Sequence, residues 1–164
     1  MQHTTNIRFI TGLLVIVLLA STIGTSIAPG FVLIIEDIDT DETYIRHPVG
    51  NGTTFAVEYT HSVEKTRVYD EYQVSGQQFV NTRMEFESYG WGLPATANVT
   101  NRNGTFVYNP SGPITTMSEL LLSPGRIANH TLIVNDERYN LVIQTNANDV
   151  RIHIERQSPM ERVV

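Results

Sequence analysis

The sequence predicts an all-β domain, an antiparallel sandwich or a barrel-like fold, that follows one N-terminal transmembrane helix. Three features indicate this: an uncharged apolar run near the N-terminus, short segments in which apolar and polar residues alternate, and Gly, Pro and Asn residues between those segments. We expect residues 1–30 to form a membrane anchor or signal segment, and residues 31–164 to form one extracytoplasmic β-domain.

The apolar run covers residues 9–28 and follows a single Arg8, while an acidic cluster lies after it. A run of about 20 apolar residues crosses the hydrocarbon core as a helix, and basic residues stay on the cytoplasmic side. We therefore expect a single-pass protein of the cell membrane, with the N-terminus in the cytoplasm and the domain outside. A cleaved secretory signal that ends at Ala28 is the alternative. Pro29 directly after that position favours a retained anchor.

The composition excludes several classes of function. The chain has no cysteine, so disulfides, thiolate metal sites and thiol chemistry are absent. The net charge is −6, and Lys65 is the only lysine. Such a surface disfavours nucleic acid as a partner. We expect no cofactor, and the acidic, lysine-poor composition also suits a high-salt habitat.

The first strands are predicted from alternation and from the turn residues that separate them. Residues 55–61 alternate with period two, as a half-buried strand does. Ser75 and Gly76 read as a two-residue hairpin loop, and Asn103-Gly104 introduces a short strand. In this part of the chain we expect strands at residues 31–36, 43–47, 55–61, 67–74, 77–88 and 105–108.

The C-terminal part predicts a three-stranded meander. Its strands cover residues 131–134, 139–145 and 150–155, and Asn and Asp residues that tolerate left-handed turns lie between them. In the last strand Val150, Ile152 and Ile154 share one face. Residues 117–122 are the one place where a helical turn competes with a strand.

His61 and Asp70 are the first candidate site residues. Alternation places His61 on the face of Val57, and Asp70 shares the parity of inward residues on the next strand. A half-buried imidazole needs hydrogen-bond partners, so a pair between His61 and Asp70 is expected, either as a structural clamp or as part of an active site. Ser62 beside His61 is poorly placed as a nucleophile. His61, Glu64 and Asp70 have acceptable ligand types for a metal ion but no recognised spacing, so metal binding stays open.

The second candidate segment holds Trp91 between Gly90 and Gly92. Two glycines indicate a tight loop with dihedrals that other residues rarely adopt. The loop is either a bend at a sheet edge, with Trp91 covering the core, or a recognition loop in which Trp91 is an aromatic anchor.

Four Asn-x-Ser/Thr tripeptides are candidate glycosylation sites in an exported domain. The alternative is that they are plain polar turns. The four asparagines are Asn51, Asn98, Asn103 and Asn129.

The two candidate segments contain a series of residues in a fixed order. The series reads Phe55-x-Val57-x-Tyr59-x-His61-Ser62-Val63-Glu64-Lys65-Thr66, then Val68-x-Asp70-x-Tyr72, then Phe86-x-Ser88-x-Gly90-x-Gly92-Leu93-Pro94. This order resembles the signature of the domain of unknown function 1850, whose members are often encoded beside TAXI-type TRAP transporters. The resemblance covers roughly residues 43–155. Two positions depart from it: Asp70 is usually Glu, and Trp91 is usually Ala.

The resemblance implies an accessory component of a solute transporter. Its partners would be the membrane subunit or the solute-binding protein of a TRAP transporter, contacted outside the cytoplasm. An exported hydrolase or metal-binding enzyme that uses His61, Glu64 and Asp70 is the alternative. The candidate binding residues are His61, Ser62, Glu64, Asp70, Gly90, Trp91 and Gly92.

Overall fold

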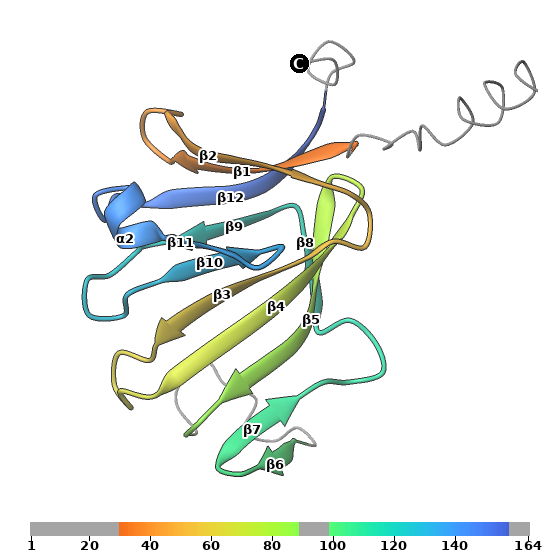
Figure 1. Ribbon diagram of the computed structural model, residues 1–164, viewed down its shortest axis with the longest axis vertical. Coiled ribbons are helices and arrows are strands. Elements are labelled where there is room, and N and C mark those ends of the chain that lie inside the picture. Colours follow the sequence, from red (N-terminus) through yellow and green to blue (C-terminus); the bar gives the residue numbers. More distant parts are fainter. Residues whose placement is uncertain (1–29, 89–98, 158–164) are drawn as a thin grey trace, which may run out of the picture.

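The computed structural model describes residues 30–88 and 99–157, which form two antiparallel sheets around one hydrophobic core (Figure 1). The predicted all-β class is therefore confirmed. The predicted transmembrane helix lies in residues 1–29, outside the described residues. Among the residues that are described, no helix is long and apolar enough to cross a bilayer.

The first sheet has four strands in the order β2-β1-β12-β9. Their bounds are β1 Phe31–Asp37, β2 Thr43–Val49, β9 Glu119–Leu122 and β12 Val150–Arg156. β1 lies between β2 and β12 and pairs with both along its length. All four of its central residues are buried, so β1 reads as a continuous apolar run and not as an alternating strand.

The second sheet has eight strands in the order β11-β10-β3-β4-β5-β7-β6, and β8 also pairs with β5. Their bounds are β3 Thr54–Thr60, β4 Arg67–Ser75, β5 Gln78–Phe86, β6 Thr100–Arg102, β7 Thr105–Tyr108, β8 Thr115–Met117, β10 Thr131–Val134 and β11 Glu137–Asn140. Only Ser118 separates β8 from β9, so the chain passes from the second sheet to the first at this point.

The core contains side chains from both sheets, because alternate residues of the facing strands point inward. Leu33 and Ile154 are cross-strand partners in the first sheet. In the second sheet the ring of Phe55 lies 5.2 Å from the rings of both Tyr72 and Phe79, measured between centroids. With no disulfide available, this burial is the main source of stability.

The predicted C-terminal meander is wrong in two respects. Residues 141–144 form the short helix α2 (Leu141–Gln144) and not the continuation of a strand, because the Asn140 side chain accepts a hydrogen bond from the Ile143 amide and caps the helix. β12 does not pair with β11 but lies between β1 and β9 in the other sheet. The predicted inward face of β12 is correct, since Val150, Ile152 and Ile154 are buried.

Two smaller predictions are also corrected. The β4–β5 hairpin turns at Gly76 and Gln77, one residue later than expected, because Ser75 still pairs with Gln78. Gly76 has a φ of +63°, the left-handed conformation that this turn requires. Residues 117–122 contain no helical turn and are divided between β8 and β9.

The chain enters and leaves the described fold at the same end. Phe31 pairs with Val49 on one side and with Arg156 on the other, and the Gln157 amide donates to the Gly30 carbonyl at 3.1 Å. The β4–β5 hairpin lies at this end too, because the Gly52 amide after β2 donates to a carbonyl near the end of β4. We call this the entry end; it lies on the right in Figure 1.

Candidate functional site

The turn after β3 covers residues 61–66, and we call it the signature turn. The His61 amide donates to the Thr66 carbonyl at 2.8 Å and closes the turn. His61 is only 8% exposed, and its Nδ1 atom accepts from the backbone amides of Val63 (3.3 Å) and Glu64 (3.2 Å). A ring nitrogen that accepts two N–H groups carries no proton, so the imidazole proton is assigned to Nε2. His61 thus holds the backbone of its own turn, much as an N-cap side chain does.

The remaining candidates in the signature turn face solvent. The side chains of Ser62, Glu64 and Lys65 are exposed. The Lys65 ammonium hydrogen-bonds the Ser62 carbonyl, and Lys65 has a left-handed φ of +57°. Ser62 is therefore poorly placed as a nucleophile for His61, because its side chain is exposed whereas the His61 ring is buried.

The structure brings the two signature segments together. The hydroxyl oxygens of Thr66 and Ser88 lie 2.8 Å apart, so the start of the second segment contacts the end of the signature turn. Gly90, Trp91 and Gly92 lie outside the described residues.

The predicted pair between His61 and Asp70 is not present. Within the described residues no hydrogen bond or ion pair joins the two side chains. The pairing register of β3 and β4 explains this absence. Asp70 pairs with Val57, whereas β3 continues to Thr60, which pairs with Arg67. His61 is four residues beyond Val57, which is about 13 Å along a strand.

Asp70 instead lies on the inner face of the second sheet with a poorly solvated carboxyl group. Its cross-strand partners are Val57 and Met84, and its Oδ1 atom is buried without a hydrogen-bond partner. Burial raises the pKa of Asp70 to about 6. Burial, together with the negative charge of Asp70, raises the pKa of Tyr59 to about 12 and also raises the pKa of Tyr72.

Two further polar side chains of this inner face were not predicted from the sequence. The ring of His130 stacks on Tyr59 with a centroid distance of 5.0 Å, and its Nδ1 atom is buried without a partner. Burial lowers the pKa of His130. Asn81 is 5% exposed, and its Oδ1 atom also has no partner. His130 lies two residues before the buried Leu132 and therefore shares its parity. This alternation could have identified His130 as an inward-facing residue.

The residues proposed for metal binding do not converge. In residues 30–88 and 99–157, no group of three or more His, Asp or Glu side chains is placed to hold a metal ion. His61 uses Nδ1 for the backbone, Glu64 is exposed, and Asp70 lies on the inner face of β4.

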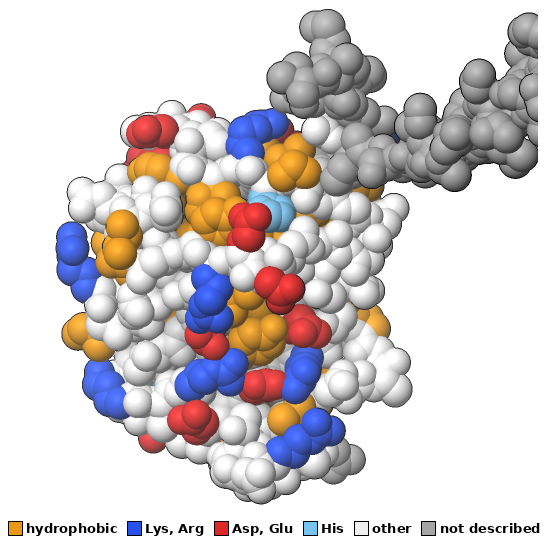
Figure 2. All heavy atoms as spheres, in the orientation of Figure 1, with side chains coloured by type: hydrophobic (Ala, Val, Ile, Leu, Met, Phe, Trp, Pro, Cys, Tyr) orange, Lys and Arg blue, Asp and Glu red, His pale blue; other side chains and the backbone are white. Residues whose placement is uncertain are grey.

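The outer face of the second sheet carries a row of ion pairs across neighbouring strands. Arg67 contacts Glu58 at 2.8 Å and Glu85 at 3.0 Å, and Arg138 also contacts Glu58, at 2.5 Å. The Arg67 guanidinium lies 5.0 Å from the centroid of the Tyr69 ring. Figure 2 shows positive and negative side chains alternating over this part of the surface. Because the charges neutralise one another, this face offers no strong field to a charged ligand.

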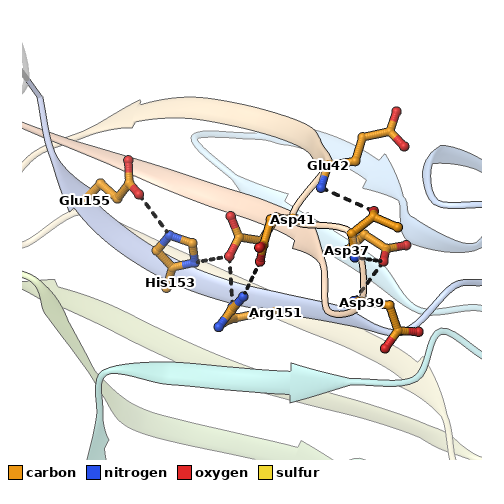
Figure 3. A network of polar contacts seen from close by, with 9 residues as sticks. Asp37, Asp39, Asp41, Glu42, Arg151, His153 and Glu155 are labelled. Atoms are coloured by element: carbon orange, nitrogen blue, oxygen red, sulfur yellow. Dashed lines mark hydrogen bonds and ion pairs between the residues drawn. The ribbon is translucent and has the colours of Figure 1, made fainter.

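A second polar network joins the first sheet to the turn that follows β1 (Figure 3). Arg151 of β12 contacts Glu36 at 2.8 Å and Asp41 at 2.9 Å. His153 lies between two carboxylates, 3.7 Å from Glu36 and 3.4 Å from Glu155. This network holds the turn at residues 38–42 against β12.

The buried carboxylate of Asp37 also stabilises the turn at residues 38–42, through hydrogen bonds. One carboxylate oxygen accepts from the amides of Asp39 (2.9 Å) and Thr40 (3.0 Å), and the other accepts from the Tyr44 hydroxyl (2.8 Å) and the Asn148 amide (3.1 Å). These hydrogen bonds, the one from Tyr44 most of all, lower the pKa of Asp37 to about 2.

Three of the four candidate glycosylation asparagines, Asn51, Asn103 and Asn129, are exposed and lie between strands. Asn103 and Asn129 have left-handed φ values of 52° and 51°, typical of turns. The side-chain oxygen of Asn51 accepts from the Gly76 amide at 2.7 Å. Asn98 lies outside the described residues.

A comparison with models of protein families confirms the family resemblance that the ordered residues of the sequence indicated. The model for a domain of unknown function, DUF1850, matches residues 55–141, more than half of the chain. The chain belongs to the DUF1850 family. The matched region extends from β3 to the start of α2 and so contains the signature turn, Asp70 and His130. No curated protein and no solved structure matches the chain.

Proposed function

We propose that this DUF1850 protein is a non-enzymatic, membrane-anchored, extracytoplasmic β-sandwich domain that is accessory to a TAXI-type TRAP transporter. One observation carries the non-enzymatic part. His61, the histidine of the candidate active site, instead holds the backbone of the signature turn through Nδ1. Of the other members of that site, Glu64 is exposed, and Asp70 lies on the inner face of β4 opposite Val57.

The apolar run near the N-terminus supports the location in this proposal. Residues 9–28 are uncharged and apolar, follow a single Arg8, and precede the described fold by only a few residues. The partner would be the membrane subunit or the solute-binding protein of the transporter, both of which are reached from outside the cytoplasm.

Asp70 supports a second candidate function, an exported hydrolase or metal-binding enzyme. A carboxyl group with a pKa raised to about 6 and an unpartnered buried oxygen is typical of functional sites as well as of structural ones. On this alternative, Asp70→Asn would abolish function without loss of folding. On the leading proposal, Asp70→Asn retains function.

Co-purification from native membranes tests the leading proposal. The full chain is tagged at its C-terminus, extracted in mild detergent and recovered together with bound proteins. A fusion of residues 1–30 to an unrelated β-domain is the matched control. We expect a transporter subunit to be recovered with the full chain and not with the control. Recovery of neither subunit would remove the reason for the proposal.

A further inference from the structure

The end of the molecule opposite the entry end is formed by four neighbouring segments. They are the turns at residues 38–42, 61–66 and 123–130 and the segment 141–149, which includes α2; we call this the turn end. It lies on the left in Figure 1, away from residue 30. β1 extends over seven residues between the two ends, which is about 20 Å.

Backbone hydrogen bonds connect these segments into one surface. The Ile38 amide donates to the Asp149 carbonyl at 3.2 Å, and the Leu141 amide donates to the His130 carbonyl at 2.9 Å. The Thr60 amide, directly before the signature turn, donates to the Ala128 carbonyl at 2.8 Å. The four segments therefore lie side by side in space, although they are far apart in the sequence.

Exposed aliphatic side chains are concentrated on this surface. The described residues contain five exposed large hydrophobic side chains, and four of them lie at the turn end. These four are Ile38 (36% exposed), Val63 (69%), Ile127 (74%) and Ile143 (76%). The fifth, Leu121 (58%), lies on β9. Figure 2 shows hydrophobic side chains separated by polar atoms along the left edge.

The segments that carry Ile38, Val63 and Ile143 are held in place by hydrogen bonds and ion pairs before any partner binds. Asp37 and Arg151 fix the turn of Ile38, and His61 fixes the turn of Val63. Asn140 caps the helix of Ile143. Ordered turns reduce the entropy lost on association, so the aliphatic side chains are preorganised for binding.

The charge of the turn end defines the chemistry of its partner. The four segments contain five carboxylates, Asp39, Asp41, Glu42, Glu64 and Asp149, and two cations, Lys65 and Arg126. Arg151 of β12 neutralises one of the carboxylates, Asp41, so the excess of negative charge is smaller but remains. Acidic groups around exposed aliphatic side chains complement a protein patch that is apolar at its centre and basic at its rim. The same groups repel the anionic headgroups of a membrane surface.

We infer that the turn end docks a soluble extracytoplasmic protein with a basic rim around an apolar patch. This inference rests on the proposed function and refines it: the partner is the solute-binding protein of the transporter, reached at the end of the domain opposite residue 30. The membrane subunit would be reached more readily from the entry end.

Charge substitutions in the full chain test the inference. Ile127→Glu and Ile143→Glu place a carboxylate at the turn end, and Gln78→Glu is the control, because Gln78 is exposed in the β4–β5 hairpin at the entry end. All three positions are exposed, so the variants are expected to fold, and thermal unfolding verifies this. The probe is the purified solute-binding protein, and its affinity for each variant is measured at low and high salt.

We expect the turn-end variants to weaken binding by about tenfold or more, and Gln78→Glu to leave it unchanged. Added salt should weaken the wild-type complex, because complementary charges are screened. Equal affinity for all variants would overturn the inference but leave the proposed function intact. If the wild-type chain captures only the membrane subunit, or binds vesicles of zwitterionic lipid in a way that Ile143→Glu abolishes, the choice of partner is wrong. Failure of the wild-type chain to bind any transporter subunit would contradict both proposals.

Discussion

Replacement of Asp70 by Asn should stabilise the protein at neutral pH but not in acid. The pKa of Asp70 is raised from 3.8 to about 6 in the fold, so the folded chain binds this proton more tightly than the unfolded chain does. Stability from this group is therefore complete below pH 3.8 and is lost as the pH rises through 6. At pH 7.5 the buried, ionised carboxylate lowers the free energy of unfolding. Replacement by an amide of the same shape removes this loss.

The magnitude follows from the shift in pKa. A difference of 2.2 units, from 3.8 to about 6, corresponds to about 3 kcal/mol at most. The real gain should be smaller, because Asp70 as a whole keeps intermediate exposure even though its Oδ1 atom is buried. In a chain of this size about 1 kcal/mol moves the unfolding midpoint by about 2–4 °C, so the gain is below about 12 °C.

The assay compares thermal unfolding of the full wild-type chain and Asp70→Asn in detergent between pH 3.5 and pH 7.5. Glu64→Gln is the control, because it removes an exposed carboxylate and should leave the midpoint unchanged at every pH. A constant difference across the pH range would refute the reasoning. A lower midpoint for Asp70→Asn at pH 7.5 would show that the carboxylate is ionised and stabilised by a contact.

Three further predictions concern His61, residues 9–28 and Trp91. His61→Ala should lower the free energy of unfolding by about 1–3 kcal/mol, because two turn amides lose their acceptor, and His61→Asn should recover part of the loss; equal thermal midpoints for wild type and His61→Ala would contradict the role of Nδ1. If residues 9–28 remain as an anchor, the chain should resist carbonate extraction, and protease added outside should digest all but a short N-terminal piece. Recovery of a soluble chain that begins near Pro29 would identify a cleaved signal instead. Trp91→Ala should leave folding nearly unchanged but weaken association with a membrane partner or lipid surface; blue-shifted tryptophan emission shielded from quenchers would show that Trp91 is a core residue.

The strands and their inward faces could be predicted from the sequence because both depend on local alternation. The burial of His61 and the parity of Val150, Ile152 and Ile154 are examples. The pairing of β12 with β1 could not be predicted in the same way, since the pattern of β12 gives its faces and not its neighbours. Proximity in sequence favoured β11, whereas in the structure β12 lies between β1 and β9 in the other sheet.

The site was predicted less well than the fold. His61 and Asp70 were both placed inward, but parity alone does not measure the distance between them along the strands, and the register separates them. His130 was missed because it precedes a short strand, although it shares the parity of that strand. α2 could have been recognised from Asn140, a favourable helix cap directly before an apolar residue.

Uptake of the transporter's solute by native cells that lack the chain tests most directly our proposal that this chain supports a solute transporter by binding and not by catalysis. We predict that uptake falls in these cells, and that both the wild-type chain and Asp70→Asn restore it. Unchanged uptake without the chain, or failure of folded Asp70→Asn to restore uptake, would contradict the claim.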